Sequence, residues 1–154
     1  MSHEHVFDCR LAWVGSERGP VSDYEGYSRE LTVDVEGKPQ LRASAAPVFR
    51  GDRALWNPED LLVAALTTCH CLSYLAVCAR AGVSVVAYED RARGKMERKD
   101  GAIRFVDVLL RPRVTLAPGA DKGKAIALHA EAHEGCFIAR SVNFPVRHEA
   151  EITP

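Results

Sequence analysis

The chain has 154 residues, of which 47% are hydrophobic and 27% are charged, as in an ordinary soluble protein with one domain. Its 20 basic and 21 acidic residues leave a formal charge of −1, and the sequence contains no dense basic stripe, which argues against a nucleic-acid partner. A chain of this length buries enough apolar surface to fold without disulfides or a structural metal, so we expect any cysteine chemistry to be functional.

The segment from Phe7 to about Ser44 consists of short apolar runs that are typical of β-strands. Turn-forming residues interrupt it at residues 15–20 and at residues 36–39, where Gly-Lys-Pro favours a turn. The pattern predicts a meander of three strands. Residues 46–56 lack periodicity and predict a loop.

The clearest helix start in the sequence is Asn57-Pro58-Glu59-Asp60. Asn57 suits the N-cap, Pro58 suits the first helical position, and the two carboxylates favour the positive end of the helix dipole. Apolar positions continue to Gly82, which predicts the C-terminal end of the helix. Because these positions surround more than one face, we expect a long central helix buried inside the protein or inside a dimer.

The second half of the chain predicts two long strands, at residues 83–97 and 103–114, joined at the hairpin signal Asp100-Gly101. Residues 121–134 predict a second amphipathic helix, and residues 142–152 predict a closing strand. The order β-β-β-α-β-β-α-β predicts an α+β fold in a single domain that covers residues 1–154.

The N-terminus lacks the basic and apolar segments of a signal peptide, and apolar runs such as residues 61–68 are shorter than the roughly 20 residues that span a bilayer. We therefore expect a cytoplasmic protein without a membrane partner. In that reducing compartment the five cysteines should be mostly free thiols, and their odd number argues against a complete set of disulfides.

Helix geometry separates the roles of the three cysteines on the central helix. Cys69 and Cys71 point about 200° apart, so they cannot share one environment or form an undistorted disulfide. Cys71 and Cys78 share a face but lie about 10 Å apart along the axis, which is too far for a bond. Free cysteines commonly fill apolar space, and we expect this role for Cys71, Cys78 and Cys9.

Cys136 follows Gly135, which interrupts the second helix at a point where a short helical turn can restart. The thiolate form is stabilised near a helix N-terminus, so Cys136 is predicted to be reactive. A buried nucleophilic Cys69 needs a positive neighbour, and an arginine suits that role because it stays charged and can also hold a carboxylate. Glu59 is a candidate for that carboxylate. It lies about 15 Å along the helix from Cys69, so a bridging arginine would have to come from another segment.

The run from Asn57 to Leu66, followed by Cys69 and later by Cys136 before a final strand, resembles the family of osmotically inducible protein C and organic hydroperoxide resistance protein (OsmC/Ohr). The resemblance covers almost the whole chain. It implies an intertwined homodimer with active sites at the subunit interface and two cysteines in each site. It also implies that Cys69 attacks the peroxide, that Cys136 resolves the product, and that Glu59 orients a catalytic arginine.

The resemblance does not identify the catalytic arginine as clearly as it identifies the two cysteines. Tyr27-Ser28-Arg29 resembles a recurrent Tyr-Ser-Arg of an OsmC-like branch, so Arg29 is the first candidate. Arg18 lies nearer to the position used by the hydroperoxide-resistance branch, and Arg50 and Arg53 are further alternatives.

Histidines also mark this sequence. His70, which directly follows Cys69, and the segment from His129 to Cys136 resemble the less studied OsmC-like branch. His129 and His133 lie one helical turn apart, with Cys136 three residues further on, and this spacing could also bind zinc or another soft metal.

The resemblance predicts a cysteine-based hydroperoxide reductase that acts on organic hydroperoxides and, more weakly, on hydrogen peroxide. Cys69 would pass through a sulfenic acid to a disulfide with Cys136, and a dithiol such as a dihydrolipoyl group would reopen that disulfide. No metal, flavin or nucleotide cofactor is needed. A metal-binding protein and a redox sensor without peroxidase turnover are the alternatives.

Overall fold

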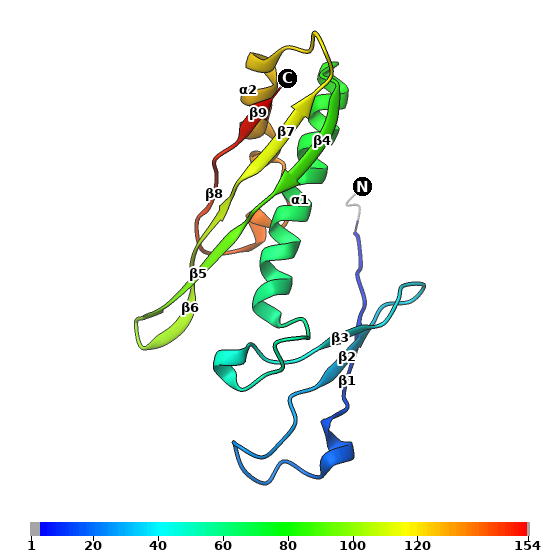
Figure 1. Cartoon of the computed structure of the whole chain (residues 1–154), viewed down its shortest axis with the longest axis vertical. Helices are drawn as coiled ribbons and strands as arrows, with labels where there is room; N and C mark the ends of the chain where they lie inside the picture. Colours follow the sequence, from blue (N-terminus) through cyan, green and yellow to red (C-terminus); the bar gives the residue numbers. More distant parts are fainter. Residues whose placement is uncertain (1–3, 154) are drawn as a thin grey trace. The chain divides into compact units, whose positions relative to one another are not determined.

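The computed structural model describes residues 4–153, and the chain divides into two compact units, one that ends at Leu61 and one that begins at Leu62. We call them the N-terminal unit and the C-terminal unit and describe each by itself (Figure 1). The long helix α1, Pro58–Ala81, begins in the N-terminal unit and continues in the C-terminal unit. A single domain for the whole chain stays a prediction.

The N-terminal unit contains the predicted meander, an antiparallel sheet in the order β1-β2-β3. Its strands are β1, Arg10–Trp13; β2, Leu31–Asp34; and β3, Leu41–Ala43. A long loop joins β1 to β2 and includes the short 3-10 helix η1, Gly15–Arg18. The predicted loop at residues 46–56 includes a second 3-10 helix, η2, Pro47–Phe49.

Both predicted ends of α1 are confirmed. Asn57 acts as the N-cap, because its side-chain Oδ1 accepts a hydrogen bond from the Asp60 backbone N–H at 2.8 Å. At the other end Gly82 takes a φ of +72°, which an L-residue with a side chain rarely adopts. The following Val83 N–H donates back to the Cys78 carbonyl at 2.9 Å, so Gly82 turns the chain out of the helix.

Within the chain, α1 is buried along one stripe and not all round. The buried residues recur at helical spacing: Leu66, His70, Tyr74, Val77 and Cys78. Other apolar residues of α1 are open, and Leu72 is 63% exposed. By length and composition α1 could also cross a membrane, although the core helix of a soluble protein passes the same test.

The C-terminal unit contains two three-stranded sheets within the described residues, in the orders β4-β7-β9 and β5-β6-β8. Their strands are β4, Val85–Asp90; β5, Arg93–Lys99; β6, Ala102–Leu110; β7, Pro112–Leu116; β8, Val146–His148; and β9, Glu151–Thr153. β8 and β9 pair in parallel with β6 and β7, and the other pairs are antiparallel.

The three long strands expected in this unit are each divided in two. The breaks fall at residues 91–92, at Arg111 and at residues 149–150. Asp90 accounts for the first two breaks, because its carboxylate accepts a hydrogen bond from the Arg111 backbone N–H at 2.7 Å and another from the Thr67 hydroxyl of α1. A side chain thus bonds to the backbone at this level, where the chain passes from one sheet to the other.

The hairpin signal and the second helix are confirmed. Asp100 and Gly101 between β5 and β6 have φ values of +51° and +83°, as a two-residue turn between twisted strands requires. Helix α2, Lys122–Glu134, begins where the Asp121 side chain accepts a hydrogen bond from the Lys124 backbone N–H at 2.9 Å. A single 3-10 turn, η3, Ala139–Ser141, follows α2.

Two apolar clusters join α1 to the rest of the C-terminal unit. Tyr74, Val77 and Cys78 pack with residues of β7, β9 and α2. Nearer the start of the helix, Leu66 packs with residues of β6 and β8. This packing fixes α1, α2 and the segment after α2 against one another, and Cys69 and Cys136 lie on these segments.

Candidate functional site

Cys69 and Cys136 are brought together inside the C-terminal unit. Cys69 lies half-buried on α1, and Cys136 lies two residues beyond the end of α2 with 1% of its surface exposed. Both are free thiols, and they lie near enough for Cys69 to raise the pKa of the Cys136 thiol. Two cysteines 67 positions apart in the sequence therefore form one site.

The turn after α2 holds Cys136 in place. The Cys136 backbone N–H donates to the His133 carbonyl at 3.2 Å, and the Cys136 carbonyl accepts from the Arg140 N–H at 3.1 Å. The backbone N–H groups of Ile138 and Ala139 also reach the sulfur and favour the thiolate, as expected at the start of a helical turn.

Burial nevertheless outweighs these N–H groups. It raises the pKa of the Cys136 thiol to about 11, and the nearby Cys69 acts in the same direction. The N–H groups expected at the start of a helical turn are present, but burial opposes the stabilisation that they give to the Cys136 thiolate. In this fold the Cys136 thiol is kept protonated at neutral pH.

The other cysteines follow their expected role in part. Cys78 is buried in the core, and burial raises the pKa of its thiol. Cys71 is half-buried, and burial followed by the charge of Asp90 raises the pKa of its thiol. Cys9 is exposed, so the expectation that it fills apolar space is wrong.

The N-terminal unit places three of the four candidate arginines around one pocket of about 340 Å³. Arg29 is half-buried and is held more firmly than the others. Its guanidinium donates to the backbone carbonyls of Tyr24 and Tyr27 and stacks over both rings, 4.1 Å from the Tyr27 centroid and 4.9 Å from that of Tyr24. Arg29 is therefore the candidate whose position the fold determines.

The remaining arginines are more open. Arg18 is 74% exposed at its side chain and lies 3.8 Å from Glu30. Arg50 forms an ion pair with Glu25 at 2.7 Å, and both side chains are exposed. Arg53 is exposed and is not among the residues that line the pocket.

Glu59 lies in the first turn of α1, where one carboxylate oxygen, Oε2, is buried and has no hydrogen-bond partner within residues 4–153. A buried carboxylate oxygen is costly unless a donor reaches it, so Glu59 is suited to receive a cationic side chain. Within the same residues no ion pair joins Glu59 to Arg29. The structure thus shows an open acceptor but does not bring the expected pair together.

Histidines that are near Cys69 or Cys136 in the sequence form a cluster that joins three elements. Within residues 4–153 the cluster comprises four rings: His70 of α1, His129 and His133 of α2, and His148 of β8. His70 Nε2 lies 3.1 Å from His129 Nδ1, and the His129 ring stacks on Tyr74 at a centroid distance of 3.8 Å. We call these four residues the histidine cluster.

Burial disfavours a proton on three rings of the histidine cluster, those of His70, His129 and His148. Burial, followed by the neighbouring histidines, lowers the pKa of His70 to about 4 and that of His129 to about 3, and burial also lowers the pKa of His148. Sequence reasoning noted His70, His129 and His133 but missed His148. His148 reaches the cluster through the parallel pairing of β6 with β8, which no local pattern announces.

The alternative of a metal site has no preformed geometry in this structure. Among residues 4–153 no group of three or more histidine, cysteine, aspartate or glutamate side chains is arranged to hold a metal ion. The helical spacing of His129, His133 and Cys136 therefore does not translate into converging ligands.

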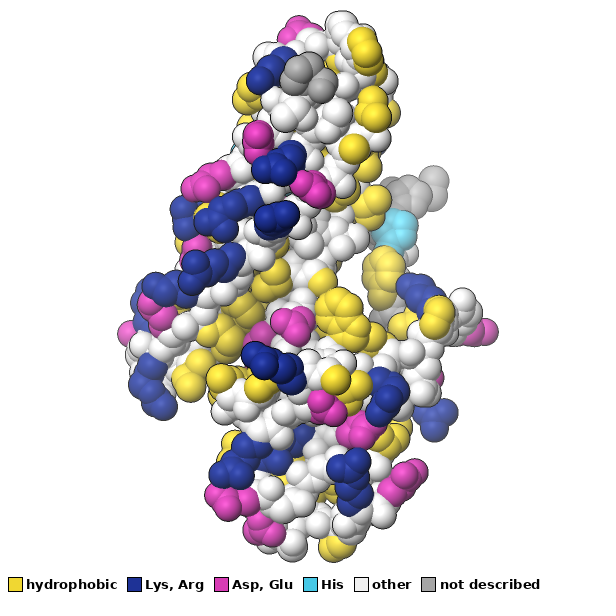
Figure 2. Space-filling view, in the orientation of Figure 1, with side chains coloured by type: hydrophobic (Ala, Val, Ile, Leu, Met, Phe, Trp, Pro, Cys, Tyr) yellow, Lys and Arg dark blue, Asp and Glu magenta, His cyan; other side chains and the backbone are white. Residues whose placement is uncertain are grey.

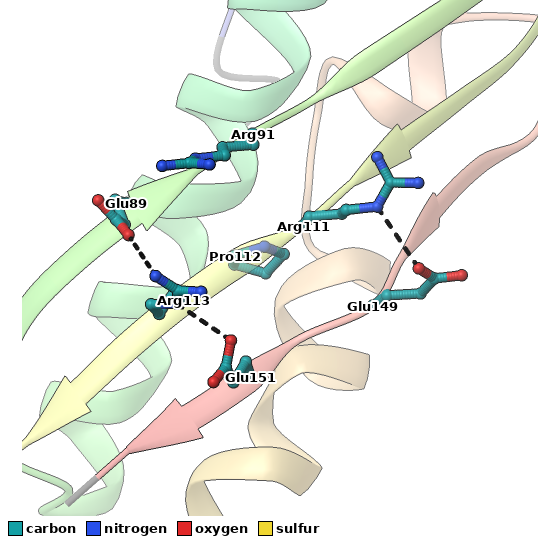
Figure 3. A pocket seen from close by; sticks show the side chains of 7 residues that line it. All are labelled: Glu89, Arg91, Arg111, Pro112, Arg113, Glu149 and Glu151. Atoms are coloured by element: carbon teal, nitrogen blue, oxygen red, sulfur yellow. Dashed lines mark hydrogen bonds and ion pairs between the residues drawn. The ribbon is translucent and has the colours of Figure 1, made fainter.

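Figure 3 shows a separate pocket of about 180 Å³ on the strands of the C-terminal unit. Arg113 lies between Glu89 and Glu151, at 3.3 and 3.0 Å, and Arg111 lies 3.6 Å from Glu149. These charges neutralise one another at an exposed surface, and the pocket contains no nucleophilic side chain. It is therefore a weaker candidate than the thiol pair.

Comparisons with known proteins agree with the fold. The model of the OsmC-like protein family matches residues 51–151, well over half of the chain. The structure of an OsmC-like protein of unknown function from Vibrio cholerae is 30% identical, has a TM-score of 0.88, and is matched over 96% of this chain and 99% of its own. The uncharacterized protein YmaD of Bacillus subtilis is 24% identical over 151 residues, which are 96% of this chain and 93% of that protein.

A more distant structure carries a functional name. The organic hydroperoxide resistance protein OhrB of Bacillus subtilis is 18% identical, has a TM-score of 0.65, and is matched over 97% of this chain and 98% of its own. Likeness at this identity shows a shared fold. Together with the family match over residues 51–151, it establishes that this chain belongs to the OsmC-like protein family, among whose structural neighbours are organic hydroperoxide resistance proteins.

Proposed function

We propose that this protein is a thiol-dependent peroxidase that reduces organic hydroperoxides and, more weakly, hydrogen peroxide. The observation that carries the proposal is the meeting of two free thiols, Cys69 and Cys136, from separate elements of the C-terminal unit. The hydroperoxide resistance protein among the structural neighbours supports the choice of substrate class.

The proposed cycle begins when the Cys69 thiolate attacks the terminal oxygen of the hydroperoxide. The O–O bond breaks, the alkoxide leaves and takes up a proton as an alcohol, and Cys69 becomes a sulfenic acid. The Cys136 thiol then forms the Cys69–Cys136 disulfide and water is released. A dithiol, such as a dihydrolipoyl group, reduces the disulfide and is itself oxidised to a cyclic disulfide.

Burial and protonation support the two different roles. Cys69 is half-buried and thus more open to a substrate than Cys136, which is 1% exposed. The raised pKa of Cys136 makes it a poor first nucleophile, because attack on a peroxide needs a thiolate. Its position next to Cys69 suits a resolving thiol, for which nearness matters more than ionisation.

We assign Arg29 and Glu59 to the stabilisation of the Cys69 thiolate and of the charge that develops on the peroxide. The support is the fixed guanidinium of Arg29 and the unpartnered buried oxygen of Glu59 within the described residues. We further propose that the active form is a cytoplasmic homodimer without a metal, flavin or nucleotide cofactor.

The test is a steady-state assay of cumene hydroperoxide consumption with dihydrolipoamide as the reductant, applied to Cys69→Ser, Cys136→Ser and the control Cys9→Ser. Cys69→Ser should abolish turnover, and Cys136→Ser should undergo a single oxidation that stops at the sulfenic acid. The exposed Cys9 should be replaceable without effect. Sustained turnover by Cys69→Ser would overturn the proposal, and a wild-type protein that forms the disulfide once without turnover would instead be a redox sensor.

A further inference from the structure

The histidine cluster and the thiol pair connect the same parts of the C-terminal unit. His70 directly follows Cys69 on α1, and His129 lies on α2, seven residues before Cys136. The His70–His129 contact at 3.1 Å and the Cys69–Cys136 contact therefore both join α1 to α2 or to the turn that follows α2.

Three side-chain hydrogen bonds within the described residues join α1 to α2, and they occur at successive positions along α2. Within residues 4–153, Lys124 Nζ donates to the Ala81 carbonyl at 2.7 Å, and the Tyr74 hydroxyl donates to the Ala125 carbonyl at 3.0 Å. The next contact toward the thiols is that of His70 with His129. Of these three bonds between α1 and α2, the bond at His129 is therefore the one nearest in sequence to Cys136.

We infer that His70 and His129 are positioning residues that hold the segment carrying Cys136 against Cys69, and that they hold it only while their rings are uncharged. The inference rests on the proposed peroxidase function and adds a regulation of its second step. In that step the Cys69 sulfenic acid and the Cys136 thiol lose water and form an S–S bond, which requires the two sulfurs to meet.

The surroundings of the pair offer no counter-charge for a proton. The titratable groups in contact with it are His133 of α2, His148 of β8 and Tyr74 of α1. None of these three groups carries a negative charge at neutral or acid pH. The charge of Asp90 acts on Tyr88 and Cys71, and the charges that act on His70 and His129 are those of other histidines. Glu149, which follows His148, is exposed and lies 3.6 Å from Arg111, and no carboxylate forms an ion pair with a histidine of the cluster within residues 4–153.

Acid should therefore separate the two helices at this point. His70 and His129 are both fully or almost fully buried, and Nδ1 of His70 and Nε2 of His129 have no hydrogen-bond partner within the described residues. A proton on either ring places an unpaired charge in this interior, and a second proton leaves two donors facing each other. Movement of α2 away from α1 relieves both costs and carries Cys136 away from Cys69.

The test follows disulfide formation in a single turnover. Reduced protein is mixed with one equivalent of cumene hydroperoxide between about pH 4 and pH 8, and the sulfenic acid and the disulfide are quantified by mass spectrometry. Wild type is compared with the double variant His70→Gln/His129→Gln, whose amides can bond to each other but do not titrate. His5→Gln, at an exposed histidine outside the cluster, is the control.

Between about pH 6 and pH 4 the rate of disulfide formation in wild type and in His5→Gln should fall at least about tenfold more than in the double variant. The fraction of Cys136 present as thiolate falls with pH and slows all three proteins equally, so the excess fall reports the histidines. Identical pH profiles for wild type and the double variant would overturn the inference. Absence of both sulfenic acid and disulfide at every pH would overturn the peroxidase proposal.

A second measurement does not depend on peroxidase activity or on a variant. Wild-type protein is labelled with a dithiodipyridine, which reacts with thiols in acid, and the labelled peptides are identified. Cys136 should become accessible as the pH falls toward about 4 while Cys78 in the core stays protected. Equal protection of Cys136 at neutral and acid pH would contradict the acid-driven separation.

Discussion

At the scale of single residues, a buried hydroxyl stabilises a protein only when it donates to an acceptor. The C-terminal unit contains one buried tyrosine hydroxyl with an acceptor and one without. The fully buried Tyr74 donates its hydroxyl hydrogen to the Ala125 carbonyl at 3.0 Å. The Tyr88 hydroxyl is buried without a partner within residues 4–153. Tyr74→Phe should therefore lower the free energy of unfolding by about 1 kcal/mol, as measured by urea denaturation.

Tyr88→Phe is the matched control, because it removes an aromatic hydroxyl that makes no hydrogen bond within the described chain. It should leave the free energy of unfolding unchanged or raise it by up to about 1 kcal/mol. An equal loss of stability in both variants would show that the Tyr74 hydroxyl contributes no specific bond.

The sequence was enough to choose the two candidate cysteines, but it did not predict the raised pKa of Cys136. Cys69 and Cys136 could be chosen because each stands in a motif that resembles one family. The balance of burial against N–H donors at Cys136 depends on segments that pack around it from elsewhere in the chain, and local sequence contains no measure of that balance. His148 was missed for the same reason, since β8 reaches its place through pairing with β6.

At the scale of secondary structure elements, Asp90 ends β4 and bonds to the backbone at the break between β6 and β7. Its carboxylate accepts from the Arg111 backbone N–H and from the Thr67 hydroxyl, and it is itself half-buried. Asp90→Ala leaves both donors without their partner and should lower the free energy of unfolding by about 1–3 kcal/mol in urea denaturation. The exposed Asp8 provides the control, and Asp8→Ala should change stability by less than about 0.5 kcal/mol.

The contact between α1 and α2 predicts a dependence of stability on pH. Histidines of the unfolded chain take up protons near pH 6.5, whereas in the folded chain the pKa of His70 is about 4 and that of His129 about 3. Below pH 6.5 the unfolded state therefore binds more protons, and the free energy of unfolding falls as the pH falls. The loss between about pH 7 and pH 5 should be on the order of 2–4 kcal/mol.

Urea denaturation at several pH values measures this dependence. The double variant His70→Gln/His129→Gln should lose most of it, while His5→Gln at the exposed N-terminal segment should keep it. A wild-type stability that stays constant down to about pH 5 would show that these rings are not held neutral by the fold.

Elements with local signals were predicted correctly, whereas the division of the long strands was not predicted. Asn57, Gly82 and Asp100-Gly101 mark both ends of α1 and the β5–β6 hairpin through bonds and dihedral angles that involve only neighbouring residues. The division of the long strands depends on a bond from Asp90 to a residue 21 positions away, so an alternating pattern read along one strand could not reveal it.

At the scale of the whole molecule, several large apolar side chains of the described residues are exposed. α1 has an apolar composition around most of its circumference but buries only one stripe, and Leu72 and Leu75 of α1 and Val86 of β4 are exposed. On the face shown in Figure 2, apolar side chains lie uncovered along the C-terminal unit beside charged side chains of its strands. An open face of this kind is typical of a surface that binds a partner.

A second copy of the chain is the partner that the family resemblance implies, and this gives a direct prediction. Leu72→Glu places a charge on the exposed face of α1 and should shift wild-type dimers to monomers in sedimentation velocity experiments. Ile126→Glu, at an exposed position of α2 that is similarly apolar, is the control and should remain dimeric. If the active site is completed across two copies, peroxide consumption should fall with the dimer fraction in Leu72→Glu and recover as protein concentration rises. A monomeric wild type with full activity would contradict the dimeric site, because every catalytic group would then have to come from one chain.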